Sequence, residues 1–220
     1  MGIGHAAVAL GASRAAPRLN VGLLIFAAFL ADFLLGIFAA FGLEQSHVPP
    51  NFATRHYLTF TFPYSHGLVA LLLWGIILGT MLCWVDARNR WRAFFVITAL
   101  VLSHFVLDAL VHVPELPLLT QNSPKVGLAI WNHMPLELTL ETLMAGIGLA
   151  VYSNLRSGTR RGRWGMTIFV LLSTALTWTQ LWTVTPPTKA QLVPTWIIAP
   201  LVFSAIPYFL DRERVAAETS

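Results

Sequence analysis

The sequence contains little cysteine and little charge. Cys83 is the single cysteine among 220 residues, so the chain can form neither an internal disulfide nor a cysteine-based zinc site. Charged residues make up only 11% of the chain, whereas hydrophobic residues make up 56% and the mean hydropathy is +0.66. This composition excludes an ordinary soluble domain and indicates an integral membrane protein.

The basic residues indicate how the chain is oriented. The formal charge is +4 and the isoelectric point is about 9.7, but Lys and Arg occur in short segments between apolar runs, so they do not indicate a nucleic-acid partner. In a six-span arrangement Arg55, Lys125 and Lys189 fall on one side of the membrane. The other side receives Arg14, Arg18, Arg88, Arg90, Arg92, Arg156, Arg160, Arg161, Arg163, Arg212 and Arg214. The positive-inside rule therefore predicts a multi-pass protein of the inner (plasma) membrane with both termini in the cytoplasm.

The apolar runs predict an all-α polytopic membrane protein that forms a single domain over residues 1–220. Six runs are long enough to cross a hydrocarbon core of roughly 30 Å. They are residues 21–43, 63–85, 93–112, 127–153, 164–184 and 192–210. Residues 2–13 are apolar but too short to span, so we expect a re-entrant amino-terminal half-helix that protein encloses on all sides.

Two sets of ionisable residues in these runs are spaced four residues apart. They are His104, Asp108 and His112 in the third run, and His133, Glu137 and Glu141 in the fourth. A step of four residues keeps side chains on one face of an α-helix. We therefore expect two ladders that face each other across antiparallel neighbouring helices.

Three further ionisable residues reach the same depth. A rise of about 1.5 Å per residue brings His5 close to the membrane midplane in the half-helix, and Asp32 lies near the middle of the first span. His66 is expected in the first turn of the second span. These side chains can approach the ladders from two sides.

The intramembrane carboxylates predict a bound cation, because no Lys or Arg lies at their depth and an unpaired charge there is costly. The candidate metal ligands are His5, Asp32, His66, His104, Asp108, His112, His133 and Glu137. Imidazole and carboxylate ligands favour zinc, with manganese or iron as alternatives. Asp108, Glu137 and Glu141 are the candidate catalytic residues, and Glu141 is either a further ligand or the general base.

Each of these residues, taken alone, can also be interpreted as part of the protein core and not as a metal ligand. A solitary histidine or aspartate in a span is more often a hydrogen-bonded core residue than a ligand, although the spacing of His104 and Asp108 favours a site. His47 and His56 lie in the loop 44–62 and are assigned no role. Three polar residues lie beside candidate ligands: Ser65, Ser103 and Asn132. We expect them to hydrogen-bond those ligands and not to act as nucleophiles.

The order of these residues resembles a known family. A histidine near the amino terminus, an Asp in the next helix, a Ser-His pair and a Ser-His-x-x-x-Asp motif are similar to the YdjM-like inner-membrane metal-dependent hydrolases. The matching positions are His5, Asp32, Ser65-His66 and Ser103-His104 with Asp108. When His112, His133 and Glu137 are added to these positions, the order of the residues also resembles the ligand order of the zinc-dependent phospholipase C and single-strand nuclease superfamily. This resemblance implies a trinuclear zinc site.

The resemblance covers roughly the first two thirds of the chain and has departures. The soluble superfamily uses a processed amino-terminal Trp as a ligand, whereas this chain begins with Met1. The YdjM-like proteins usually have a Pro before the helix Asp and a second acid or His after it, and Ala31-Asp32-Phe33-Leu34 has neither. The number of metal ions therefore stays open.

The sequence thus predicts a membrane-embedded hydrolase with a di- or trinuclear zinc site that opens toward the outer leaflet. A lipid-like phosphoester suits a site at that depth, since metal ions activate water at neutral pH and stabilise charge on a phosphoryl oxygen. A cation or proton transporter could use the same residues, but the apolar stretches Leu71–Leu82 and Phe94–Leu102 on the cytoplasmic side favour the enzyme. A non-catalytic metalloprotein scaffold, the substrate and the oligomeric state stay open.

Overall fold

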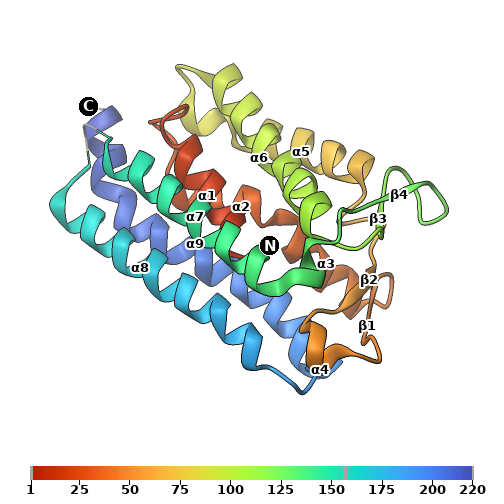
Figure 1. Cartoon of the computed structure of the whole chain (residues 1–220). Helices are drawn as coiled ribbons and strands as arrows, with labels where there is room; N and C mark the ends of the chain where they lie inside the picture. The colour runs from red at the N-terminus through yellow and green to blue at the C-terminus, as the bar shows by residue number, and fades with distance from the viewer. Residues whose placement is uncertain (1, 156–157, 220) are drawn as a thin grey trace.

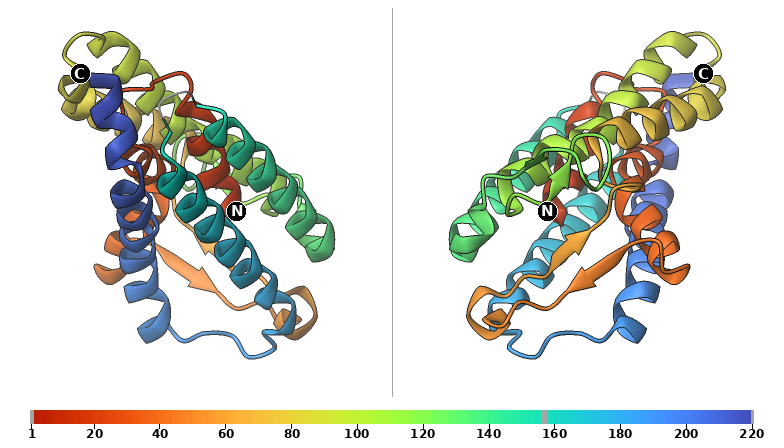
Figure 2. Two further views of the ribbon diagram at one scale, coloured as in Figure 1. Left: turned by 90° about the vertical axis from the view of Figure 1, so that its left-hand side faces the viewer. Right: turned by 90° about the vertical axis from the view of Figure 1, so that its right-hand side faces the viewer.

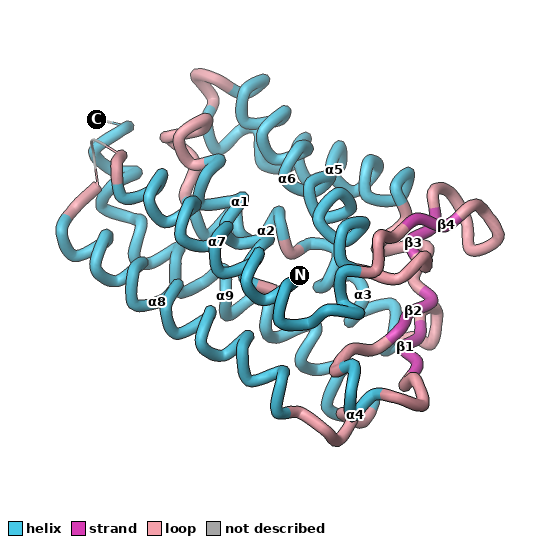
Figure 3. The backbone as a smooth tube through the Cα atoms, in the orientation of Figure 1, coloured by secondary structure: helices cyan, strands magenta, loops and turns pink. Residues whose placement is uncertain are grey.

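The computed structural model describes residues 2–155 and 158–219 as a helical bundle with two short β-hairpins gathered at one end (Figures 1 and 3). The helices are α1 (Ile3–Ala12), α2 (Val21–Ala28), α3 (Leu30–Ala40), α4 (Phe52–Arg55), α5 (Leu68–Leu82), α6 (Arg90–Val111), α7 (Met134–Ser153), α8 (Arg160–Trp178) and α9 (Lys189–Thr219). Short 3-10 helices are η1 (Cys83–Asp86), η2 (Ile130–His133) and η3 (Thr179–Trp182). The expected helical class is therefore confirmed, while Arg156, counted above for orientation, lies outside the described residues.

The hairpins are antiparallel. Strands β1 (Gln45–His47) and β2 (Thr59–Thr61) pair with Gln45 opposite Thr61, and β3 (Leu116–Pro117) and β4 (Lys125–Val126) pair with Leu116 opposite Val126. Both lie at the end of the bundle away from the basic connectors (Figure 1). They position the chain segments that approach the candidate site from that end.

The short helix α1 lies inside the bundle, where it packs against α2, α6 and α7. Apart from His5 it consists of Ala, Gly, Val, Ile and Leu, which give it a largely apolar surface, and Ile3, Ala6, Ala9 and Leu10 are at most 1% exposed. A helix that is apolar all round is stable only when it is enclosed. The expected half-helix over residues 2–13 is present and is covered by protein.

The contact between α1 and α7 depends on a glycine. A Cβ built at Gly148 would lie 2.4 Å from the carbonyl oxygen of Ala7, closer than real Cβ contacts allow. The two helices therefore approach each other at a separation that a larger residue would prevent.

The expected first span, residues 21–43, is broken. Helices α2 and α3 meet at Phe29 with a bend of 52°, so Asp32 lies in the first turn of α3 and not in the middle of one straight helix. A broken helix leaves backbone carbonyls without their usual N–H partners, and such carbonyls need other donors. One of these carbonyls contacts the candidate site.

The apolar helices have the lengths needed to cross a membrane in four cases, or in five if the α2–α3 pair counts as one span, among the residues that the structure describes. The four are Leu68–Asp86, Arg90–Val111, Ile130–Ser153 and Lys189–Glu218. Helix α8 corresponds to the expected span 164–184, but it begins in the charged stretch Arg160–Arg163 and ends at Trp178. The expected count of six spans is not confirmed.

Two boundaries differ from expectation at residues of interest. His66 precedes α5, which begins at Leu68, and lies in a turn whose backbone N–H groups at Tyr64 and Ser65 donate to Glu44. His133 lies in η2, before α7 begins at Met134. The second ladder is therefore not continuous on one helix.

A buried ion pair joins α9 to the α1–α2 connection at the basic end of the bundle. Arg214 and Asp211 are 2% and 0% exposed, with Arg214 Nε 2.6 Å from Asp211 Oδ1. Arg214 also donates to the carbonyl oxygens of Pro17 and Leu19, and Tyr152 donates to Asp211. Arg214, expected only as a charge that marks the cytoplasmic side, is part of the protein interior.

Candidate metal centre

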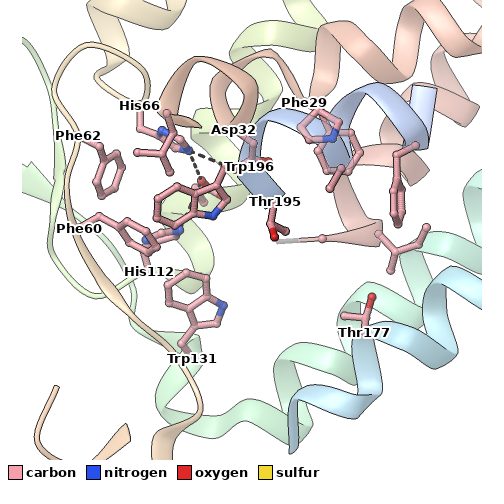
Figure 4. Close-up of a pocket in the computed structure, with 17 residues that line it drawn as sticks. Phe29, Asp32, Phe60, Phe62, His66, His112, Trp131, Thr177, Thr195 and Trp196 are labelled. Carbon is pink, nitrogen blue, oxygen red and sulfur yellow. Dashed lines mark ion pairs between the residues drawn. The ribbon is translucent and has the colours of Figure 1, made fainter. Parts of the chain in front are cut away.

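Four histidine side chains surround the carboxylate of Asp108 in the interior of the bundle. The Nε2 atoms of His104, His112 and His66 lie 3.2, 3.5 and 3.6 Å from Asp108 Oδ2. His5 Nε2 lies 3.2 Å from Asp108 Oδ1, and its ring stacks on that of His104 with centroids 3.8 Å apart. Asp32 Oδ1 is 3.7 Å from His66 Nε2 on the cavity side (Figure 4).

Helix α6 and the residue that directly follows it supply three of these residues. His104, Asp108 and His112 follow each other at intervals of four, and all three are at most 4% exposed. Helix α6 ends at Val111, and His112 takes an extended conformation while its N–H still donates to the Asp108 carbonyl. This end directs the chain toward Glu115, whose side chain returns to His112.

The hydrogen bonds of His104 fix which of its ring nitrogens is free. Its Nδ1 lies 2.7 Å from the carbonyl oxygen of Ala28, at the break between α2 and α3. A carbonyl only accepts, so Nδ1 carries the hydrogen and, in the neutral ring, Nε2 presents a lone pair to the cluster. The bend at Phe29 thus has a use in the site, because it leaves the Ala28 carbonyl available to His104.

The ring of His66 is held in the same way by a two-step chain. Ser65 Oγ donates to Glu44 Oε2 at 2.6 Å, so the hydroxyl oxygen accepts from His66 Nδ1 at 2.7 Å. Glu44 also accepts from the backbone N–H groups of Tyr64 and Ser65. Burial raises the pKa of the Glu44 carboxyl, and its hydrogen bonds with Ser65 and Tyr64 oppose that rise.

The ring of His112 is held by a carboxylate. His112 Nδ1 lies 2.7 Å from Glu115 Oε1, and Glu115 Oε2 accepts from the backbone N–H of Phe60 in β2. The other ring nitrogen therefore points to Asp108. Trp131 covers the ring, with centroids 3.8 Å apart.

Ring nitrogens of the cluster direct lone pairs at one another, and a cation bound between them would remove this repulsion. His66 Nε2 and His104 Nε2 are 3.2 Å apart, and each is the acceptor nitrogen of its ring when neutral. His5 is buried as well, and among the described residues its ring nitrogens make no well-aligned hydrogen bond, although Nε2 lies 3.2 Å from Asp108 Oδ1. Histidines whose outer nitrogen is hydrogen-bonded and whose inner nitrogen faces carboxylates are typical of metal sites.

Two overlapping groups have ligand atoms close enough to hold an ion. His5, His104 and Asp108 form one group and Asp32, His66 and His104 form the other, and in each the ligand atoms lie within 4.8 Å of one another. Imidazole with carboxylate suits zinc, manganese or iron. The residues therefore fit a metal ion, and the sharing of His104 puts the two groups side by side.

The cluster lies at the wall of a cavity of about 300 Å³ (Figure 4). Asp32, His66, Asp108 and His112 form its polar part, and the Asp32 side chain is 28% exposed. The rest of the lining is mostly apolar or aromatic, and it comes mainly from α1, the α2–α3 break at Phe29, α3, β2, η2 and α9. A molecule in the cavity would contact the ligand groups at one end and hydrocarbon or aromatic rings elsewhere.

The second ladder has a different environment from the first. Glu141 accepts from the backbone N–H groups of Gly2 and Gly4, at 2.7 and 3.3 Å, and so caps the start of α1. Glu137 is buried beside Glu141, whereas His133 is exposed near Arg55 and Asn132. Of the described metal-ligand groups, none includes His112, His133, Glu137 or Glu141.

Of the three polar residues expected to hydrogen-bond candidate ligands, only Ser65 does so in the described structure. Ser65 bonds His66, but Ser103 donates within its own helix to Leu100, and Asn132 accepts from Arg55 and Tyr57. The sequence interpretation did not include Glu44 and Glu115, which hold His66 and His112 from loops. Glu115 carried a usable signal, since it lies three residues after His112, whereas nothing local links Glu44 to Ser65.

No protein-family model matches the chain, and comparisons with curated proteins and with solved structures find no match. Fold and site define a helical protein whose apolar helices are compatible with a membrane and whose buried His/Asp groups can hold a metal ion. The function is therefore inferred from the geometry of the site.

Proposed function

We propose that the protein is a membrane-embedded, metal-dependent hydrolase that acts on the phosphoester of a lipid-like molecule. The observation that carries the proposal is the pair of ligand groups that share His104 and open into a mostly apolar cavity. Two adjacent ions, most simply zinc, would activate water and stabilise negative charge on a phosphoryl oxygen. The resemblance to YdjM-like hydrolases in the order of His5, Asp32, His66, His104 and Asp108 agrees with this proposal.

The residues of the chain supply binding, orientation and exclusion of water. Ala28 and the Ser65–Glu44 pair keep the Nε2 atoms of His104 and His66 available as ligands. Asp32 is the acidic ligand most exposed to the cavity, so it is the one that contacts substrate or water there. Phe60, Phe62 and Trp196 form aromatic walls that reduce the access of bulk water.

The membrane setting is part of the proposal. Six spans, α2–α3, α5, α6, α7, α8 and α9, would place both termini and the basic connectors in the cytoplasm of the cell and the hairpins outside its inner membrane. Helix α1 would then be a re-entrant half-helix enclosed by the other helices. The partners would be membrane lipids, with no nucleic acid.

A transporter of cations or protons is the competing proposal, and the packing below the cluster argues against it. Between His104 and the basic end of α6, Ile97, Leu100 and Val101 are at most 2% exposed, and Leu24 and Ile25 of α2 pack in the same core. A transport pathway needs polar groups or water on both sides of its binding site. This apolar layer separates the cluster from the basic end of the bundle, which supports the hydrolase over a transporter.

The proposal is tested with purified protein loaded with zinc and mixed with a total lipid extract. We expect release of a phosphate or headgroup product that is lost in His104→Ala and kept in His47→Ala, whose ring lies exposed in β1. Proteoliposomes are tested in parallel for proton flux. Proton flux without lipid hydrolysis would contradict the hydrolase and support the transporter.

A further inference from the structure

Two neighbouring cavities share part of their lining and form one hollow. The cavity at the metal centre shares Gly2, Phe60, Trp131, Thr177 and Trp196 with a second cavity of about 460 Å³. The second cavity continues to the connection between α8 and α9, where Thr183 and Pro187 line it. A path therefore leads from the ligand residues to the outer ends of these helices.

Helices α8 and α9 contact each other mainly toward the basic end of the bundle. Gly165 of α8 lies against the Leu210 side chain, and the rings of Phe169 and Phe203 are 5.5 Å apart. Beyond this contact the helices diverge toward the loop that joins them (Figure 2). Thr177 on α8 and Trp196 on α9 then face the hollow across an open region (Figure 4).

The surface on both sides of this opening is apolar. Leu172 and Leu176 of α8 are 66% and 62% exposed, and Ile198 and Val202 of α9 are 56% and 46% exposed. In water such a surface would be unfavourable, whereas in a bilayer it meets lipid chains. The opening therefore faces hydrocarbon and not solvent, provided that the membrane setting proposed above holds.

The hollow is apolar along α9 and polar at the metal centre. Trp196, Ala199, Pro200 and Phe203 form its α9 side, and Asp32 and His66 lie at the polar end. This arrangement is complementary to an amphiphilic molecule, whose hydrocarbon chain would lie along α9 and whose polar group would lie at the candidate metal ligands.

We propose that the opening between the outer halves of α8 and α9 is a lateral window through which the hydrocarbon chain of a bilayer lipid enters and lies against Trp196–Phe203. The proposal rests on the proposed function for the membrane setting and for the identity of the bound lipid as substrate. It adds a binding site for the hydrocarbon chain and a route of entry from the bilayer, neither of which the chemistry at the metal centre requires.

The test is photolabelling of the full chain in vesicles of phosphatidylglycerol that carries a diazirine near the end of one acyl chain. We expect label on the cavity-lining side chains Trp196 and Phe203, located within their peptide by fragmentation, as well as on the lipid-facing Ile198 and Val202. The label on Trp196 and Phe203 should be lost in Ala199→Trp, which fills the cavity side of α9, whereas the label on Ile198 and Val202 should remain. The matched control is Ile198→Trp, which adds the same side chain on the exposed face and should keep the label. Thr195→Trp, on the exposed edge of the cavity, provides a second blocking variant if Ala199→Trp does not fold.

Label on Trp196 and Phe203 that is unchanged in both blocking variants, or that is absent in the unaltered protein, would overturn the window. Labelling requires no turnover, so the outcome is independent of whether the protein is a hydrolase. If the window is correct and hydrolysis occurs, Ala199→Trp loses activity on long-chain lipid but retains activity on a short-chain water-soluble phosphoester. Equal loss on both substrates, with unchanged labelling, would contradict the window and leave the hydrolase in place.

Discussion

Three histidines of the centre have their Nδ1 atoms held by acceptors that lie outside it. The acceptors are the Ala28 carbonyl for His104, the Ser65 hydroxyl for His66 and the Glu115 carboxylate for His112. Each bond orients a ring and selects the tautomer whose Nε2 can bind a cation. At the scale of single residues, these outer partners should matter nearly as much to metal binding as the ligands themselves.

The hydroxyl of Ser65 provides the most direct test of this requirement. In Ser65→Ala, His66 loses the acceptor for Nδ1 and the buried Glu44 loses a donor, so we expect the affinity for zinc to fall by about 10- to 100-fold. Competition with a fluorescent chelator measures that affinity. Ser103→Ala is the matched control, since Ser103 donates only to Leu100 of its own helix and also precedes a ligand histidine. Equal affinities in the two variants would contradict the assigned role of Ser65.

At the scale of elements, the position of the centre depends on α1, whose His5 ring stacks on His104. The α1 start is capped by Glu141, and its side is in close contact with α7 at Gly148. Both contacts come from one helix, so α7 acts as the support for the half-helix. The buried carboxyl that the sequence suggested as a ligand or base thus has a structural use in holding His5 in place.

Two glycines of α7 allow a matched comparison of this support. A Cβ at Gly148 would meet the Ala7 backbone, whereas a Cβ at Gly146 would have no neighbour within 4 Å. We expect Gly148→Ala to lower the free energy of unfolding by about 1–3 kcal/mol because of overpacking. Gly146→Ala should be neutral or should stabilise the helix by up to about 1 kcal/mol. Thermal unfolding in detergent, followed by circular dichroism, distinguishes the two, and a neutral Gly148→Ala would contradict the close contact.

The elements also show what the sequence could and could not predict. The spacing of His104 and Asp108 predicted their common face, and the short apolar run predicted α1, because both are local properties of a helix. The break at Phe29 carries no Pro or Gly, and the Ala28 carbonyl beside it is bonded to His104, which lies 76 residues from Ala28. The same limit applies to Glu44 and to Glu141, whose partners lie in distant segments, and to His133, which a 3-10 turn separates from α7.

At the scale of the whole molecule, the proposed orientation requires the basic connectors and the hairpins to lie at opposite ends of the bundle. The basic connectors and the Asp211–Arg214 pair lie at one end, and the hairpins lie at the other (Figure 1). Helix α8, which begins in the charged stretch Arg160–Arg163, is not among the described helices that are long and apolar enough to cross a membrane. Whether α8 crosses the membrane decides between five and six spans.

Cysteine labelling in whole cells tests this topology. In a Cys83→Ser background, single cysteines replace the exposed residues Asn89, Thr120 and Thr185. We expect a membrane-impermeant maleimide to label positions 120 and 185 in cells whose outer envelope is permeabilised and whose inner membrane is intact. Position 89 should be labelled only after lysis. Failure to label position 185 would mean that α8 does not cross, and labelling of position 89 in unlysed cells would reverse the orientation.

The central claim is that the residues around Asp108 bind a metal ion, and the metal content of the purified protein tests it most directly. After exposure to zinc and removal of loosely bound ions, we expect at least about one zinc per chain in the unaltered protein, because the site offers three ligands in each group. The zinc should be lost in His104→Ala and Asp108→Ala and kept in His133→Ala, whose ring is exposed away from the cluster. A folded protein that binds no zinc, manganese or iron, or one that keeps its metal without His104 and Asp108, would contradict the account.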